Sequence, residues 1–289
     1  MTGKVHVRLR DVTLRDGLQN EAVFVPTEIK RILLDQIVAA GFRSLEVTSF
    51  VRGDRVPALR DADELARSLP EYAGVEYRAL VPNERGMQRF LSAKVATAVF
   101  FISASPAHNQ ANLQRTTKES LKEIARLIRL VKEEGRQAVG AIATAFVCPF
   151  AGVVPDHQLE RIAEELVKSG VKELALADTV GQATPDMVYE RCAKIKNRFP
   201  FLELSLHLHD SKGYGLRNML AGMEAGVYSF DVAQAGLGGC PYVPGAPGNL
   251  SAIRVLEGLE ERGVETGLDY RRVCQLEEYI QRFMKRRNE

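Results

Sequence analysis

Residues 121–135 read LKEIARLIRLVKEEG, and a few positions later residues 141–146 read AIATAF. In the first segment, apolar residues recur three and four positions apart and the pattern stops at a glycine, which predicts an amphipathic helix. The second segment is apolar almost throughout, as expected of a parallel strand that is covered by helices. A helix that leads into a covered strand is the repeating unit of an α/β fold.

The same alternation continues along the chain, without a linker or a low-complexity stretch. We expect strands near residues 6–13, 43–48, 75–81, 95–103, 137–145, 172–177, 202–208 and 229–235. We expect helices near residues 27–40, 60–68, 83–92, 117–134, 156–168, 185–198, 214–224 and 249–262, with an additional one at 269–285. Eight strand–helix units in order predict an α/β protein with a (β/α)8 TIM-barrel fold and one extra C-terminal helix.

The barrel is expected to span about residues 5–262, followed by the extra helix at about 269–285, so that residues 1–289 form a single catalytic domain. The alternative is an open, doubly wound sheet. No G-x-G-x-x-G segment follows the first strand, so the dinucleotide-binding version of that fold lacks support.

Composition narrows the classes of partner. The chain has 289 residues, of which 45% are hydrophobic and 26% are charged, with a formal net charge of +2. Such a balanced charge argues against nucleic acid as the main partner. No apolar run approaches the roughly 20 residues of a membrane span, and the N-terminus has no apolar signal segment. Four widely spaced cysteines without a C-x-x-C favour free thiols and a cytoplasmic location.

In a TIM barrel, catalytic side chains gather at the C-terminal ends of the strands. The expected seventh strand ends in HLHD, and residues two apart on a strand share a face, so His207 and His209 can chelate a metal ion. The alternative is that both imidazoles cap the strand. Asp16, after the first strand, could add an oxygen ligand, because in a closed barrel that strand adjoins the eighth and lies near the seventh. Mixed nitrogen and oxygen ligation suits one divalent cation, Zn, Mn or Mg.

Asp16 lies within VTLRDGLQNE (12–21), a segment with more polar groups than a solvated turn requires. Its neighbour Arg15 would place a fixed cation beside the metal, where the two could bind an oxygen whose charge grows during reaction, such as an enolate. The structural alternative is a salt bridge with Glu46 or Asp178. Both roles can coexist, since a carboxylate would orient the guanidinium.

Residues 236–249 are rich in glycine and proline. They form either a long connecting loop or a cover that closes on the substrate and carries a reactive group, Cys240. Cys148, Cys192 and Cys274 occupy more structural settings. Asn249 opens the last barrel helix, where it is either the N-cap or a further metal ligand.

Together these motifs resemble those of the 3-hydroxy-3-methylglutaryl-CoA (HMG-CoA) lyases. The resemblance rests on RDGLQNE, EVTSFV followed by VP, LADTVG, HLHDSKG and GLGGCPYVPGAPGN, which occur in the family's order from residue 12 to residue 249. That family belongs to the metal-dependent TIM-barrel lyases and Claisen-type condensing enzymes. The combination of RDGLQNE with GLGGCPY is specific, whereas a lone H-x-H is not.

The resemblance implies a retro-Claisen cleavage of an acyl-CoA, with HMG-CoA giving acetyl-CoA and acetoacetate. It implies that Asp16, His207, His209 and Asn249 ligate the cation. Arg15 would stabilise the enolate and Cys240 would transfer a proton, while Glu46 and Asp178 would organise the arginine, the metal water and the substrate hydroxyl. Either His207 or a group linked to Asp178 would take the proton of the 3-hydroxyl.

Three departures from the family's pattern put the acyl group in question. Ile253 and Ala151 stand where acids are expected, and Ser211-Lys212 follow the H-x-H-D. Losing acids could widen the pocket for a longer or differently substituted acyl chain, whereas Ile253 could instead face the core of its helix.

A condensing synthase of the same superfamily is one rival, although those enzymes typically read RDGEQ and HxHND where this chain has RDGLQ and HLHDS. A noncatalytic barrel that binds CoA esters is another, against which the full set of expected ligands and Cys240 count. A homodimer is among the assemblies that the sequence allows, and no motif decides the oligomeric state.

Overall fold

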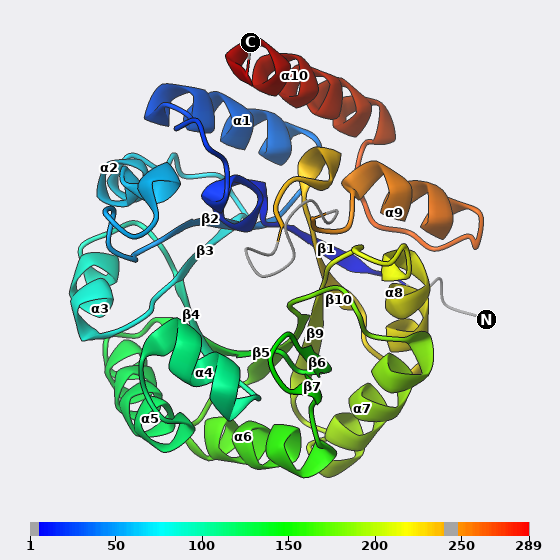
Figure 1. Ribbon diagram of the computed structural model, residues 1–289. Coiled ribbons are helices and arrows are strands. Elements are labelled where there is room, and N and C mark those ends of the chain that lie inside the picture. The colour runs from blue at the N-terminus through cyan, green and yellow to red at the C-terminus, as the bar shows by residue number, and fades with distance from the viewer. Residues whose placement is uncertain (1–5, 240–247, 289) are drawn as a thin grey trace.

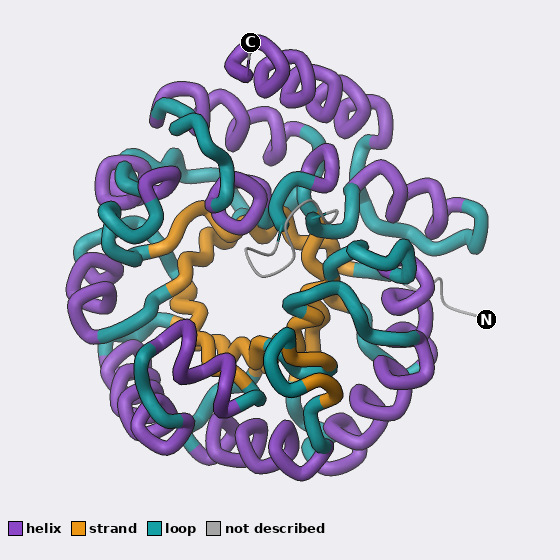
Figure 2. The backbone as a smooth tube through the Cα atoms, in the orientation of Figure 1, coloured by secondary structure: helices purple, strands orange, loops and turns teal. Residues whose placement is uncertain are grey.

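The computed structural model of the protein describes residues 6–239 and 248–288. Within them, eight parallel strands close into a barrel that a ring of helices surrounds (Figures 1 and 2). In spatial order the strands are β1 (Arg8–Asp11), β10 (Ser229–Val232), β9 (Glu203–Leu208), β8 (Glu173–Asp178), β5 (Gln137–Ala143), β4 (Thr97–Ser103), β3 (Glu76–Leu80) and β2 (Ser44–Ser49). The predicted (β/α)8 fold is confirmed.

The barrel closes where the first and last strands of the chain meet. β1 pairs with β10 from Arg8↔Ser229 to Asp11↔Val232, and it contacts β2 on its other edge. β10 in turn pairs with β9. The segment after β1 therefore lies close to the end of β9, as the sequence analysis expected for Asp16 and the histidine pair.

The described residues form the helices α1 to α10, most of which cover the outer face of the barrel. They are α1 (Thr27–Ala39), α2 (Ala62–Arg67), α3 (Glu84–Leu91), α4 (Pro106–Leu113), α5 (Thr117–Glu133), α6 (Asp156–Lys168), α7 (Pro185–Arg198), α8 (Gly215–Glu224), α9 (Ala252–Glu260) and α10 (Tyr270–Asn288). α5 illustrates how the sequence forms such a helix. A capping box of Thr116 and Glu119 starts it, and its buried apolar residues recur at helical spacing: Ile124, Leu127, Ile128 and Val131.

The extra helix α10 lies outside the ring, against α1 and beside α9 (Figure 1). It also touches the start of α9 through polar contacts, since Glu277 accepts a hydrogen bond from the backbone N–H of Ile253 at 3.3 Å. None of the described helices is long and apolar enough to cross a membrane.

Several short elements depart from the expectations. The first strand ends at Asp11, not at residue 13, and a single π-helical turn, η1 (Thr13–Gly17), follows it. The helix α4 and an antiparallel hairpin of β6 (Val147–Cys148) and β7 (Gly152–Val153) were not predicted. Two 3₁₀ turns, η2 (Pro57–Leu59) and η3 (Gln234–Gly236), complete the described elements.

Candidate active site

Three side chains that the sequence analysis selected as metal ligands converge at one end of the barrel. Asp16 comes from η1, and His207 and His209 come from the end of β9. The Nε2 atoms of the two imidazoles are 3.2 Å apart, and the Asp16 Oδ2 atom lies 3.7 Å from His207 and 3.5 Å from His209. All three side chains are buried, so a divalent cation can bind among them.

Asp231, on β10, holds one of these imidazoles in place, and the sequence analysis missed it. Its Oδ2 atom lies 3.0 Å from His207 Nδ1, which leaves Nε2 directed at Asp16 and His209. A carboxylate behind a metal-ligating histidine fixes its tautomer and ring orientation. Arg10 Nε donates to the other oxygen of Asp231 at 2.7 Å. The sequence signal for Asp231 was an acid between two apolar residues of a strand, Phe230 and Val232.

Charge balance in this cluster favours ionised carboxylates. Burial opposes ionisation, but the Arg15 guanidinium and the two imidazoles hold the pKa of the Asp16 carboxyl well below its usual range. Burial likewise disfavours a charged imidazole, but Asp231 and Asp16 raise the pKa of His207 above its ordinary value. A cation bound here would therefore meet a preformed negative charge.

Asn249 joins the same cluster but does not cap a helix. Ser251 is the N-cap of α9, and its side chain accepts from Arg254 N, so the N-cap alternative for Asn249 is wrong. Asn249 bridges to His209 through the backbone, and its Nδ2 donates to Asp16 Oδ2 at 2.8 Å and to the Leu237 carbonyl at 2.9 Å. Its Oδ1 atom is buried without a hydrogen-bond partner, which fits a fourth, oxygen ligand.

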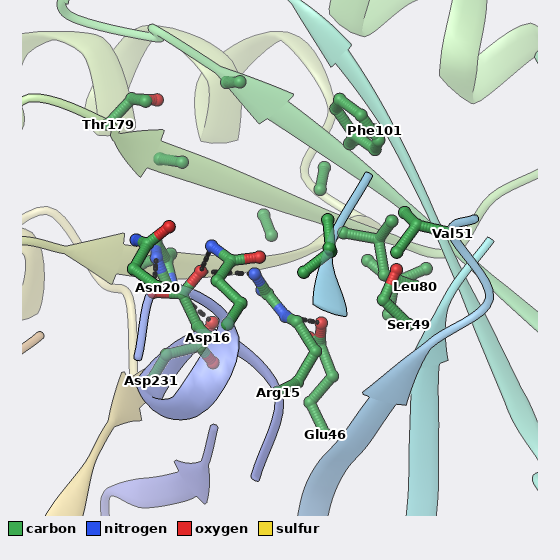
Figure 3. A pocket seen from close by; sticks show the side chains of 18 of the residues that line it. Arg15, Asp16, Asn20, Glu46, Ser49, Val51, Leu80, Phe101, Thr179 and Asp231 are labelled. Atoms are coloured by element: carbon green, nitrogen blue, oxygen red, sulfur yellow. Dashed lines mark hydrogen bonds and ion pairs between the residues drawn. The ribbon is translucent and has the colours of Figure 1, made fainter. Parts of the chain in front are cut away.

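Arg15 pairs with Glu46 through Nε and with Asp16 through Nη1 (Figure 3). Of the two carboxylates proposed for its salt bridge, Glu46 is therefore the partner. The Asp178 carboxylate instead accepts from the backbone N–H groups of Gln182 and Ala183, at 3.1 and 3.0 Å. These contacts let the carboxylate shape the loop after β8. Burial raises the pKa of Asp178, although the same backbone N–H groups oppose that rise.

The polar residues after Asp16 also have defined partners. Gln19 Nε2 donates to Asp16 Oδ1 at 2.9 Å, whereas Asn20 Nδ2 donates to the Gly239 carbonyl at 2.6 Å. Gln19 therefore supports the Asp16 carboxylate, and Asn20 holds the segment that ends at Gly239. Residues 16 and 19 lie on the same side of a helical turn, which explains why the Gln19 amide reaches the Asp16 carboxylate.

Two glycines allow the backbone to approach this cluster closely. Gly17 has no left-handed φ, so it is not needed for a sharp turn, and a Cβ there would lie 3.3 Å from the Leu237 Cβ. Gly238 adopts a φ of +112°, and a Cβ there would overlap the Asn249 amide. Cys240 lies outside the described residues, but Gly239 before it lines the site.

The cluster opens into a cavity of about 460 Å³, within the range of small-molecule sites. Its walls include residues of the cluster and small or apolar residues from the barrel strands, and Figure 3 shows Phe101 and Thr179 across the cavity from Arg15 and Glu46. Of the three departures from the lyase pattern, none lines it. Ile253 packs on the hydrophobic core, and Ala151 and Lys212 are exposed.

The sequence profile of the HMGL-like family matches residues 6–280 of the chain. The chain belongs to the HMGL-like family. Among its relatives, the hydroxymethylglutaryl-CoA lyase YngG of Bacillus subtilis (strain 168) is 36% identical over 278 residues, which cover 96% of this chain and 93% of that protein. The (R)-citramalyl-CoA lyase of Chloroflexus aurantiacus is 37% identical over 273 residues, covering 91% and 86% of the two chains.

Solved structures of HMGL-like proteins share the whole barrel. The crystal structure of the Bacillus subtilis HMG-CoA lyase superposes with a TM-score of 0.94 at 36% identity, over 97% of this chain and 94% of that one. An HMG-CoA lyase from Acinetobacter baumannii, solved with coenzyme A and 3-methylmalate, superposes with a TM-score of 0.92 at 33% identity, over 97% and 92%. The resemblance found in the motifs is therefore confirmed.

Proposed function

We propose that this HMGL-like protein is a metal-dependent carbon–carbon lyase that cleaves a 3-hydroxy-acyl-CoA, with HMG-CoA as the substrate that the relatives favour. The products would then be acetyl-CoA and acetoacetate. The convergence of Asp16, His207 and His209 beside the Arg15 guanidinium, at the wall of one cavity, is the observation that carries the proposal. The relatives named as HMG-CoA lyases, and the coenzyme A bound to one of them, support an acyl-CoA substrate.

Asp16, His207, His209 and Asn249 would hold one divalent cation, Mg, Mn or Zn. When bound, the cation would polarise substrate oxygens and lower the pKa of the 3-hydroxyl. The donor set of two imidazoles, one carboxylate and one amide oxygen does not select among these metals.

Glu46 is the group that we propose for accepting the proton of the 3-hydroxyl. It lines the cavity, and in the described structure only its Oε1 atom is hydrogen bonded, to Arg15. His207 suits this task less well, because Nδ1 faces Asp231 and Nε2 faces the metal ligands, so both ring nitrogens are engaged. Asp178 does not line the cavity, and we propose that it positions the loop carrying Thr179.

Loss of the hydroxyl proton allows the bond between C2 and C3 to break. C3 becomes a carbonyl carbon, and the bonding electrons pass to C2 and its thioester as an enolate. Arg15 stabilises this developing charge because its guanidinium is fixed by two carboxylates before the reaction begins. Cys240 would then return a proton to C2 and complete acetyl-CoA.

The (R)-citramalyl-CoA lyase among the relatives makes a second substrate worth testing. Citramalyl-CoA carries its carboxylate directly on C3, so the same bond cleavage would release a 2-oxo acid with acetyl-CoA. This reaction would use the same proton acceptor, the same arginine and the same metal ligands.

The deciding experiment measures acetyl-CoA release from HMG-CoA and from citramalyl-CoA, with added Mg, Mn or Zn and with a chelator. We expect turnover that requires metal and is lost in His209→Ala together with metal binding. His157→Ala, which removes an exposed imidazole on α6, is the matched control and should behave as wild type. Full turnover by metal-free His209→Ala would contradict the proposal.

We further propose that residues 1–289 act as one catalytic domain, because α10 packs on α1 and contacts the start of α9. A cytoplasmic location stays a prediction. Consistent with it, Cys148, Cys192 and Cys274 are free thiols in the structure.

A further inference from the structure

The cavity does not stop at the metal cluster but continues into the barrel. Val99, Val139, Ala141 and Ala175 line it, and these residues lie in the middle of strands β4, β5 and β8. Ala177 pairs in register with His207, so Ala175, two residues earlier on the same face, is one side-chain layer deeper than the imidazole. We call this deeper part, lined by Leu80, Val99, Phe101, Val139, Ala141 and Ala175, the barrel hollow.

The hollow exists because small residues stand where a TIM barrel usually places bulky ones. Layers of branched side chains normally fill the interior of this fold. Here β5 and β8 contribute alanines at positions 141, 143, 175 and 177 of the cavity wall. Phe101 and Ala141 are consequently only partly buried, although both lie within strands of a closed barrel.

The six residues that define the hollow are uncharged, and the two arginines of the described chain that line the cavity near them, Arg10 and Arg78, are already paired with carboxylates. Arg10 pairs with Asp231 and Glu173, and Arg78 pairs with Glu173 and Glu76. Arg15, above them, pairs with Glu46 and Asp16. A buried carboxylate without a free cationic partner is strongly disfavoured, so the group that enters the hollow is uncharged.

We propose that the barrel hollow binds the alkyl group on C3 of the acyl chain, and that the preferred alkyl group is larger than methyl. The inference rests on the proposed lyase function. The first carbon of the alkyl group is bonded to C3 and is two bonds from the hydroxyl oxygen. It would therefore lie beside the metal cluster, and the hollow is the apolar space that opens there. HMG-CoA is then a substrate whose methyl group leaves part of the hollow unfilled.

The test compares four acyl-CoA esters, 3-hydroxyglutaryl-CoA and its 3-methyl, 3-ethyl and 3-propyl derivatives, in the acetyl-CoA release assay with metal. An added methylene in a fitting apolar pocket raises kcat/KM by roughly ten-fold or more. We therefore expect kcat/KM to rise about ten-fold from the 3-methyl to the 3-ethyl or 3-propyl ester. A wild-type preference for the 3-methyl ester of that size would overturn the inference and leave the lyase function intact.

Variants that fill the hollow should reverse the preference. Ala175→Leu should lower kcat/KM for the 3-propyl ester by roughly ten- to hundred-fold while changing the 3-methyl ester much less. Ala175→Val, a smaller change, provides the same comparison if leucine disturbs the barrel. The matched control is Ala138→Leu, which adds the same atoms on β5 at a position that packs outside the cavity.

The outcomes separate the two proposals. Equal losses for all four esters in Ala175→Leu and Ala175→Val, with metal binding retained, would show that the hollow does not select the alkyl group. Release of acetyl-CoA from none of the esters by the metal-loaded wild type would overturn the lyase function and this inference together.

Discussion

His207 Nδ1 lies 3.0 Å from the Asp231 Oδ2 atom, and this contact turns the opposite ring nitrogen toward Asp16 and His209. The Asp231 carboxylate thus leaves Nε2 as the ring nitrogen that is available to a cation. Asp231 is itself held by Arg10, so the orientation of the imidazole depends on a chain of buried charges that extends into the barrel.

Asp231→Asn should weaken metal binding by about 10- to 100-fold, because the amide is a poorer acceptor and fixes the His207 tautomer less well. Titration calorimetry with Mn or Zn measures the change in Kd. Glu203→Gln, which alters an exposed carboxylate on the adjoining strand, is the control. An unchanged Kd in a folded Asp231→Asn protein would show that Asp231 has only a structural role.

Arg15→Met should lower kcat by roughly 10²–10⁴-fold, by analogy with the loss of an oxyanion donor. The charge that Arg15 meets develops mainly in the transition state, so the effect belongs in kcat more than in KM. Arg15→Lys, which preserves the charge beside Glu46 and Asp16, should recover part of the rate. A near-normal kcat with a raised KM would reassign Arg15 to substrate binding.

Cys240→Ser should lose most turnover while it retains the metal, because a serine hydroxyl is a much weaker acid than a thiol. Bound substrate should also slow alkylation of Cys240. Cys192 provides an internal reference, since burial raises the pKa of its thiol to about 12 and it should resist alkylation in the folded protein. Full activity after complete alkylation of Cys240, established by mass spectrometry, would assign the segment a structural role.

Arg55→Met should raise KM for acyl-CoA substrates about three- to ten-fold with little change in kcat. Arg55 lines the cavity on the exposed segment before η2, and among the described residues its guanidinium has no ion-pair partner, so it is available to an anionic group of the substrate. Arg52→Met is the control, because Arg52 is paired with Asp54 and does not line the cavity. Equal kinetics for both variants would rule out this contact.

Asp11→Asn should change how stability depends on pH. Burial raises the pKa of Asp11 to about 6 from an ordinary value near 3.8, although Gln234 and Thr13 donate to its carboxylate. A raised native pKa means that the stabilisation is complete below about pH 4 and is lost as pH rises through 6, a change of roughly 3 kcal/mol.

The difference in free energy of unfolding between Asp11→Asn and wild type should therefore shift in favour of asparagine by roughly 3 kcal/mol from pH 4 to pH 7. Urea denaturation at several pH values measures this difference, which does not require the variant to be as stable as wild type. A difference that stays constant across the range would show that Asp11 is ionised in the native protein throughout.

The barrel was predictable because its strands and helices repeat with strong, distinct periods. The segment around η1 was not predictable, because five residues are too few to show a helical or strand periodicity. The predicted strand was extended to residue 13 across the apolar Val12. The same holds for α4 and the β6–β7 hairpin, which are short and lie within a connection between a strand and a helix. Tertiary contacts, not local propensity, fix such segments.

The site was predictable where chemistry and spacing coincide. Two histidines two residues apart at a strand end must share a face, whereas Asp231 offers only one acid inside a strand. Asp231 matters because it contacts His207 on the neighbouring strand β9. No local sequence pattern links these two residues. Arg10 and Glu173 were missed for the same reason, although charged residues in buried strands usually have partners.

The contact between Asp16 and Asn249 joins residues that lie 233 positions apart. On the ribosome, Asp16 emerges roughly 10–50 s before Asn249, at the usual rates of synthesis. During that interval β1 cannot pair with β10, and the four proposed metal ligands cannot come together. One edge of the growing sheet therefore stays unpaired until the last strand has been made. A cation held by these four residues would therefore bind only after all of them have been synthesised. By mass action it would then shift the folding equilibrium toward the closed barrel, so that removal of the metal would lower the stability of the mature protein.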